Sequence, residues 1–188
     1  LDRIGSANND LVMVDTTQGI QRFEEGGNPD PHVWLSPSLV RIQAASIAEA
    51  LAAADPAHAE AYKANLDAFV TDIDELDADI RETLEGVETR QFMVFHPSWR
   101  YFAEDYGLEM IPIEVGGQEP SASELAGLIA AAKEDGIEVI FAQPEFSTEA
   151  AETIAAEIGG EVLLISPLAE DWLDNLRRVA ETFAEHLG

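Results

Sequence analysis

Two histidines stand in settings that suit metal coordination. His96 follows the apolar run Phe92–Phe95 and precedes Pro97, and His32 lies in a short loop that contains three prolines. Neutral imidazole is a ligand for zinc and other transition metals, and proline-rich loops hold their side chains stiffly because proline fixes φ. The simpler alternative for His96 is a strand-end histidine that hydrogen-bonds only to the backbone.

Polar side chains also follow the other predicted strands of the second half. The carboxyl ends of parallel strands converge on one edge of a sheet, so we expect these side chains to gather near His96 and to face His32. Imidazole and carboxylate are the ligands that zinc accepts when no thiolate is present, and the chain has no cysteine. The residues are Glu114, Gln143, Glu145 and Ser166.

The second half of the chain alternates short apolar runs with amphipathic segments. This alternation predicts an α/β fold, with parallel strands joined by right-handed helical crossovers. A capping box of Ser121 and Glu124 marks the start of one helix. The predicted strands are 92–95, 110–113, 139–142 and 161–165, and the predicted helices are 98–106, 121–134, 147–158 and 170–187.

The first half is predicted to contain a strand, a loop and a helix. The apolar run 11–14 is typical of a short strand. Ser36 and Pro37 form a good N-cap and first-turn pair. They predict a helix that continues to about residue 54 and buries an apolar stripe.

The longest helical pattern begins after this helix. Asp55 and Pro56 repeat the cap-and-proline pair, and the apolar spacing that follows predicts a helix on the order of 45 Å long. A helix of that length suggests a link between two lobes, although an isolated coiled-coil arm is the alternative. We therefore expect the remainder of an N-terminal lobe at 1–54, a linking helix at 55–86 and a C-terminal α/β lobe at 87–188.

The composition restricts the partners of the chain. The 37 acidic and 10 basic residues give a formal net charge of -27, which disfavours nucleic acids and anionic membranes as partners and attracts cations. The acidity itself is explained most simply as a solubility or high-salt adaptation of the surface. No apolar run is long enough to span a bilayer. The sequence reads as a start in mid-fold, so we expect a fragment that lacks upstream residues.

Six stretches resemble the metal-binding solute-binding proteins of zinc and manganese ABC transporters. The resemblance covers nearly the whole chain. It implies a two-lobed α/β protein, each lobe having a parallel sheet flanked by helices, with one long rigid helix between the lobes and the ion in the cleft. The C-terminal lobe would be complete and the N-terminal lobe partial. The stretches are DPHVWLSP (30–37), DPAHAEAYKANL (55–66), FHPSWRYFAEDYGL (95–108), IEVGGQEPS (113–121), FAQPEFS (141–147) and SPLAEDW (166–172).

The resemblance also implies a set of metal ligands. His32 matches the ligand of the amino-terminal lobe, and His96 matches the first ligand of the carboxyl-terminal lobe, where histidine rather than carboxylate favours Zn²⁺ over Mn²⁺. The earliest histidine ligand of the family lies upstream of this chain. Ser166 stands where the family usually has aspartate, so the site loses a ligand, takes up water or uses Glu145. We favour Glu145.

These residues and the resemblance predict a function without catalysis. We expect a monomer that captures a divalent transition metal, Zn²⁺ above all, and delivers it to the permease of an ABC importer. Its location would be periplasmic or otherwise extracytoplasmic, either free or anchored to the membrane upstream. Two alternatives stay open: a zinc-dependent hydrolase with Glu114 as general base, and an adhesin-like interaction module with a structural metal.

Overall fold

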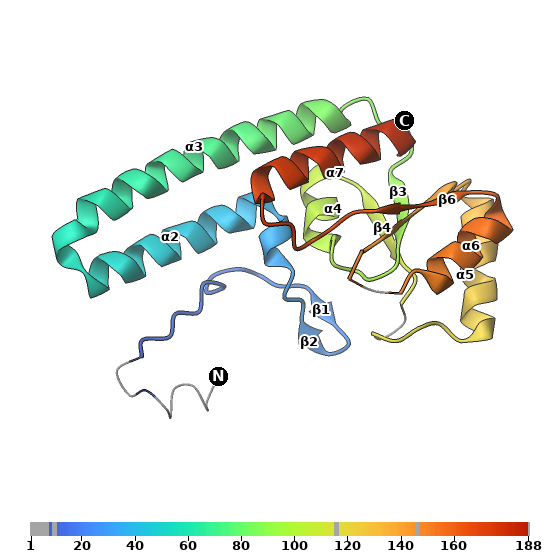
Figure 1. The fold of residues 1–188 in the computed structure, drawn as a ribbon, viewed down its shortest axis with the longest axis horizontal. Coiled ribbons are helices and arrows are strands. Elements are labelled where there is room, and N and C mark those ends of the chain that lie inside the picture. Colours follow the sequence, from blue (N-terminus) through green and yellow to red (C-terminus); the bar gives the residue numbers. More distant parts are fainter. Residues whose placement is uncertain (1–7, 9–10, 115–116, 146, 188) are drawn as a thin grey trace.

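A four-stranded parallel sheet forms the core of the second half of the chain, with helices packed around it (Figure 1). The structure is a computed structural model that describes residues 8, 11–114, 117–145 and 147–187. The strands lie in the order β4-β3-β5-β6. The strand β4 therefore pairs with one side of β3, and the chain then crosses β3 to place β5 and β6 on its other side. This confirms the predicted α/β fold. The strands are β3 (Gln91–Val94), β4 (Glu109–Pro112), β5 (Val139–Ala142) and β6 (Glu161–Leu164).

Two long helices precede the sheet and run antiparallel to each other (Figure 1). They are α2 (Pro37–Ala54) and α3 (Ala59–Leu84), and the 3₁₀ turn η2 (Pro56–His58) joins them. The 26 residues of α3 span about 39 Å, so the predicted long helix is present. All of its fully buried side chains lie between Ile73 and Leu84. The first half of α3 therefore extends beyond the sheet and packs mainly beside α2 (Figure 1), although the ring of Phe69 also lies 6.2 Å from that of Trp172, measured between centroids.

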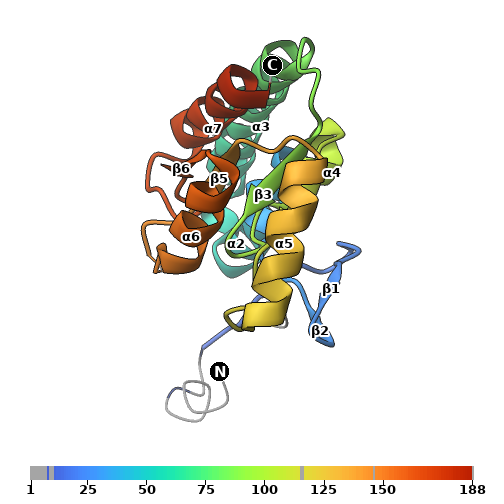
Figure 2. The same ribbon diagram turned by 90° about the vertical axis from the view of Figure 1, so that its right-hand side faces the viewer.

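Helices cover both faces of the sheet (Figure 2). Phe92 and Val94 of β3 face a cluster shared with α3, α4 (Arg100–Tyr106) and α7 (Trp172–Leu187). Met93, between them, faces the opposite cluster with α5 (Ala122–Glu134) and α6 (Glu149–Ile158). Successive side chains of a strand point to opposite faces, and a strand covered on both faces becomes a continuous apolar run. The run that predicted β3 is thus explained by the two helical layers.

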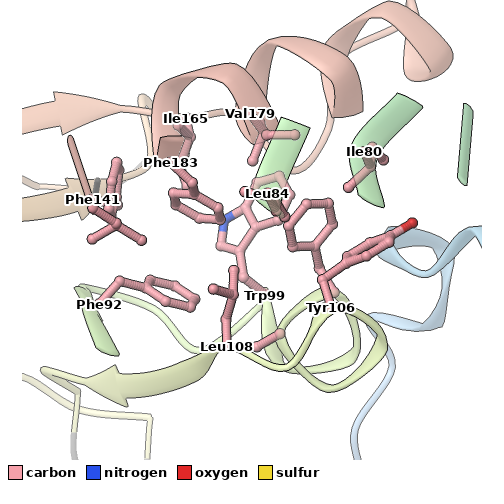
Figure 3. Close-up of a cluster of buried hydrophobic side chains, with 14 of the residues drawn as sticks. Ile80, Leu84, Phe92, Trp99, Tyr106, Leu108, Phe141, Ile165, Val179 and Phe183 are labelled. Carbon is pink, nitrogen blue, oxygen red and sulfur yellow. The ribbon is translucent and has the colours of Figure 1, made fainter. Parts of the chain in front are cut away.

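The larger core cluster is centred on aromatic side chains (Figure 3). The ring of Phe183 on α7 lies 4.6 Å from Phe141 and 4.7 Å from Phe92, measured between ring centroids. Phe102 on α4 lies 5.8 Å away. These residues and Trp99 are fully buried. The cluster fixes α4 and α7 against β3, the strand that ends two residues before His96.

The predicted helix starts are only partly confirmed. Ser36 caps α2, since its side chain accepts a hydrogen bond from the Leu39 backbone N–H at 3.1 Å, and the capping box at the start of α5 is present. Asp55 does not cap the long helix. Its carboxylate instead contacts His58 Nδ1 at 2.7 Å, and α3 begins only at Ala59.

Two expectations for the first half are wrong. Residues 11–14 are not a strand: Leu11 and Val12 are 41% and 77% exposed, and no strand of the described chain lies beside them to pair with their backbone. The apolar stripe of α2 is not buried either, because Ile42, Ile47 and Leu51 are exposed. An apolar pattern predicts a buried face only where another element covers that face.

A short hairpin precedes the segment that carries His32. Its strands are β1 (Glu24–Glu25) and β2 (Asn28–Pro29), and Gly26 and Gly27 join them with φ of 56° and 79°. A two-residue hairpin turn of this kind needs positive φ at both positions, which glycine adopts without steric penalty. Among the described residues, no helix is both long enough and apolar enough to cross a membrane.

Candidate metal centre

His32 lies in a rigid turn between the hairpin and α2. It immediately precedes the 3₁₀ helix η1 (Val33–Leu35) and is only 9% exposed. The Asp30 carboxylate accepts two hydrogen bonds from it: one from the His32 backbone N–H at 2.9 Å and one from the Nδ1 atom at 2.7 Å. Asp30 itself is 1% exposed. These bonds and Pro31 between the two residues fix the orientation of the ring.

His96 is held in the same way at the end of β3. Its Nδ1 atom lies 2.6 Å from the Glu114 carboxylate. Glu114 stands at the end of the neighbouring strand β4, where its backbone N–H donates to the Phe95 carbonyl oxygen at 3.0 Å. Both residues therefore occupy the edge formed by the carboxyl ends of the strands, and His96 follows β3, one of the two strands between which the strand order reverses. Open α/β sheets bind ligands at that reversal point.

The two imidazole rings meet at this edge. The Nε2 atoms of His32 and His96 are 3.4 Å apart, and the ring centroids are 5.2 Å apart with an interplanar angle of 75°. The residues are 64 positions apart in the chain. The predicted convergence of these two side chains is therefore present in the structure.

The distance between the Nε2 atoms suits a shared zinc ion. Two Zn–N bonds of about 2.0–2.1 Å that meet at a tetrahedral angle place their nitrogen atoms about 3.4 Å apart. A carboxylate accepts hydrogen bonds and donates none, so Nδ1 carries the hydrogen in both carboxylate–imidazole pairs. In a neutral ring Nε2 is then the acceptor. Two such atoms at this distance repel each other unless a cation or a proton lies between them.

Gln143 supports the turn that carries His96. It follows β5, is 1% exposed, and its side-chain amide donates to Ser98 Oγ and, at 3.5 Å, to the His96 carbonyl oxygen. The sequence predicts Gln143 at the carboxyl ends of the parallel strands, and it lies there in the structure. Its side chain contacts the turn rather than the imidazole ring, so it helps to fix the position of His96.

Glu145 and Ser166 form a separate pair. Ser166 Oγ donates to Glu145 Oε1 at 2.9 Å, and both side chains belong to loops after β5 and β6. Among the residues that the structure describes, no three His, Cys, Asp or Glu side chains are grouped closely enough to hold an ion. The structure therefore brings together the two histidines but does not place Glu145 in a cluster with them.

Sequence reasoning missed the two carboxylates that orient the rings. It overlooked Asp30 and considered Glu114 only as a strand-end residue or a general base. The spacing Asp-Pro-His was the available signal for Asp30, because a carboxylate two residues before a histidine in a tight turn can reach its Nδ1 atom. No local signal pairs His96 with Glu114, since the register between β3 and β4 decides that contact.

Comparison with known proteins assigns the family. Residues 1–186 match the family described as zinc-uptake complex component A, periplasmic, or ZnuA. The chain belongs to the ZnuA family. The family resemblance inferred from the sequence motifs is therefore confirmed. ZnuA proteins are components of metal uptake, which is a transport role rather than an enzyme class.

Individual ZnuA-like proteins match over most of the chain. It is 36% identical over 141 residues to the high-affinity zinc uptake system protein ZnuA of Bacillus subtilis. The matched region covers 74% of this chain and 44% of that protein. It is 37% identical over 149 residues to the zinc-binding protein AdcA of Streptococcus pyogenes. The matched region covers 77% of this chain and 29% of AdcA. A crystal structure of a ZnuA superposes with a TM-score of 0.97 at 46% identity, covering 100% of this chain and 74% of that one. The chain thus spans less than half the length of these two curated relatives.

Proposed function

We propose that the chain captures Zn²⁺ outside the cytoplasm and delivers it to the permease of an ABC importer. The observation that carries this proposal is the pair of Nε2 atoms 3.4 Å apart, each on a ring whose Nδ1 atom contacts a carboxylate. Membership of the ZnuA family supports the transport role and the extracytoplasmic location. The zinc-binding relatives support the choice of metal.

His32 and His96 would bind the ion through Nε2. Asp30 and Glu114 keep the hydrogen on Nδ1, which leaves Nε2 as the metal-binding atom and makes each ring a stronger donor to the metal. The two carboxylates also place negative charge close to the cation. The protein thus supplies two oriented ligands before the metal arrives.

Glu145 is our proposal for a third ligand. Its carboxylate accepts a hydrogen bond from Ser166, the residue at which the motif resemblance implies an aspartate ligand. That bond holds the acidic group beside Ser166. Binding would require the loop after β5 to bring this carboxylate to the histidines. Zinc that then still has an open position takes water or a ligand from outside the chain.

The ligand types favour Zn²⁺ over Mn²⁺. Imidazole suits zinc, whereas manganese prefers carboxylate, carbonyl and water oxygens. Manganese also prefers six ligands in an octahedral arrangement. Two imidazoles at a tetrahedral separation meet the demands of zinc better.

The hydrolase alternative is disfavoured by the position of Glu114. A general base must reach the water that the metal activates. The Glu114 carboxylate instead lies 2.6 Å from the Nδ1 atom of His96, whereas the proposed metal lies at Nε2 of that ring. Glu114 therefore orients a ligand and does not face the ion.

Competitive titration with a chromogenic chelator tests the proposed function. We expect the affinity for Zn²⁺ to exceed that for Mn²⁺ by at least about tenfold. The affinity for Zn²⁺ should fall by roughly tenfold or more when the pH is lowered, because a protonated imidazole cannot bind the metal. Equal affinity for the two metals, or zinc binding that is insensitive to this pH change, would contradict the proposal.

A further inference from the structure

One face of α4 holds both ends of the segment that carries His32. The Tyr101 hydroxyl donates to the Asp30 carbonyl oxygen at 3.1 Å and accepts from the Phe23 backbone N–H at 3.1 Å. The Asp105 carboxylate accepts from Ser36 Oγ at 2.6 Å. We call Tyr101 and Asp105 the α4 clamp.

The geometry of the α4 clamp matches the segment that it holds. Tyr101 and Asp105 are four positions apart, so they lie on the same face of α4 about one turn apart. Their partners, Asp30 and Ser36, lie on either side of His32. Both clamp bonds therefore restrain the position of His32 without touching its ring.

The helix that bears the clamp is itself fixed to His96. It begins at Arg100, four residues after His96, and only a short turn separates it from the β3 strand. Its Phe102 packs into the core cluster. Trp99, the residue before the helix, lies in the same cluster as Phe183 (Figure 3). A shift of the His32 segment relative to α4 would therefore change the distance between the two imidazole rings.

We propose that the α4 clamp sets the separation of the two imidazole rings, so that Tyr101 and Asp105 are positioning residues for metal capture. This inference rests on the proposed function. Metal sites respond to small displacements, and loss of a partner that orients a ligand lowers metal affinity by about 10- to 100-fold. The clamp acts through Asp30 and Ser36, not on the metal.

Asp105 is a partly buried carboxyl whose ionised form is disfavoured by its surroundings. Burial raises the pKa of the Asp105 carboxyl, and the hydrogen bonds from Ser36 and Ser38 oppose this effect. The charged groups that face it are Asp77, which also raises its pKa, and Arg81, which lowers it. A carboxyl whose pKa is raised by folding contributes stability at low pH that is lost as the pH rises through that pKa. At neutral pH, removing this charge should therefore not weaken the fold through electrostatics.

Substitutions of Asp105 test the clamp on the 188-residue chain. We expect Asp105→Ala to lower zinc affinity by about tenfold, with X-ray absorption showing fewer imidazole ligands on the zinc. Asp105→Asn should bind nearly as well as the unsubstituted chain, because its carbonyl oxygen still accepts a hydrogen bond from Ser36. Glu104→Ala is the matched control, since Glu104 is an exposed carboxylate on the same helix and its loss changes the net charge equally.

Tyr101→Phe tests the other end of the segment and keeps the buried ring. It should also lower zinc affinity, while thermal unfolding of the metal-free variants checks that each is folded. Unchanged affinity and two imidazoles on the zinc in both Asp105→Ala and Tyr101→Phe would overturn the clamp but leave the proposed function intact. Equal losses in Asp105→Ala and Glu104→Ala would also overturn it, because the charge change alone would explain them. Zinc that carries no imidazole in the unsubstituted chain would overturn both proposals.

Discussion

Replacing His96 by alanine is expected to lower the affinity for Zn²⁺ by more than about a hundredfold, because losing a ligand should exceed the 10- to 100-fold effect of losing a group that only orients one. His32→Ala should have a similar effect, since the two Nε2 atoms are 3.4 Å apart and would share one ion. The pair should also be non-additive: once one imidazole is gone, removing the other changes little. Isothermal titration of the single and double variants measures these effects.

His58→Ala is the matched control for these variants. His58 also contacts a carboxylate through Nδ1, that of Asp55 at 2.7 Å, but it lies at the exposed turn before α3. It therefore has the same local pairing without a second imidazole. We expect zinc affinity to be unchanged in this variant. If His32→Ala and His96→Ala bound zinc as tightly as His58→Ala, the histidine pair would not be the metal site.

Phe183→Ala is expected to have the largest effect on stability, about 3–5 kcal/mol in the free energy of unfolding. The ring is fully buried between the sheet and α4 and lies within 6 Å of Phe92, Phe102 and Phe141, measured between centroids. Its removal leaves a cavity that these large rings cannot fill without moving. Urea unfolding followed by tryptophan fluorescence gives the change in free energy.

Leu168→Ala is the control for the core substitution. Leu168 is 63% exposed, so its truncation should change the free energy of unfolding by less than about 0.5 kcal/mol. A loss for Phe183→Ala as small as that for Leu168→Ala would mean that α7 does not pack on the sheet as described. The position of His96, which follows the same core strand, would then also lose its support.

Much of the C-terminal fold could be predicted because its two central strands, β3 and β5, are covered on both faces. The apolar runs that mark β3 and β5 follow from that burial, and the residues of β5 were predicted without error. The run at residues 11–14 has similar composition but is exposed in the structure. The difference lies in what packs against each run, and that information is not local to the run.

The candidate site was predictable to the same extent. The convergence of His32 and His96 followed from the rule that ligands bind at the carboxyl edge of a parallel sheet, together with the motif resemblance. The partners of their Nδ1 atoms depend on distances below 3 Å, which the turn at Asp30 and the register of β4 determine. Glu145 as a ligand stays a prediction.

The most direct test is a crystal structure of the chain with zinc, with anomalous data collected on both sides of the zinc absorption edge. The account predicts one strong zinc peak about 2.0–2.1 Å from the Nε2 atoms of both His32 and His96. The hydrogen bonds from Nδ1 to Asp30 and Glu114 should be retained. A zinc peak elsewhere on the acidic surface, with the two rings still facing each other and no metal between them, would contradict it.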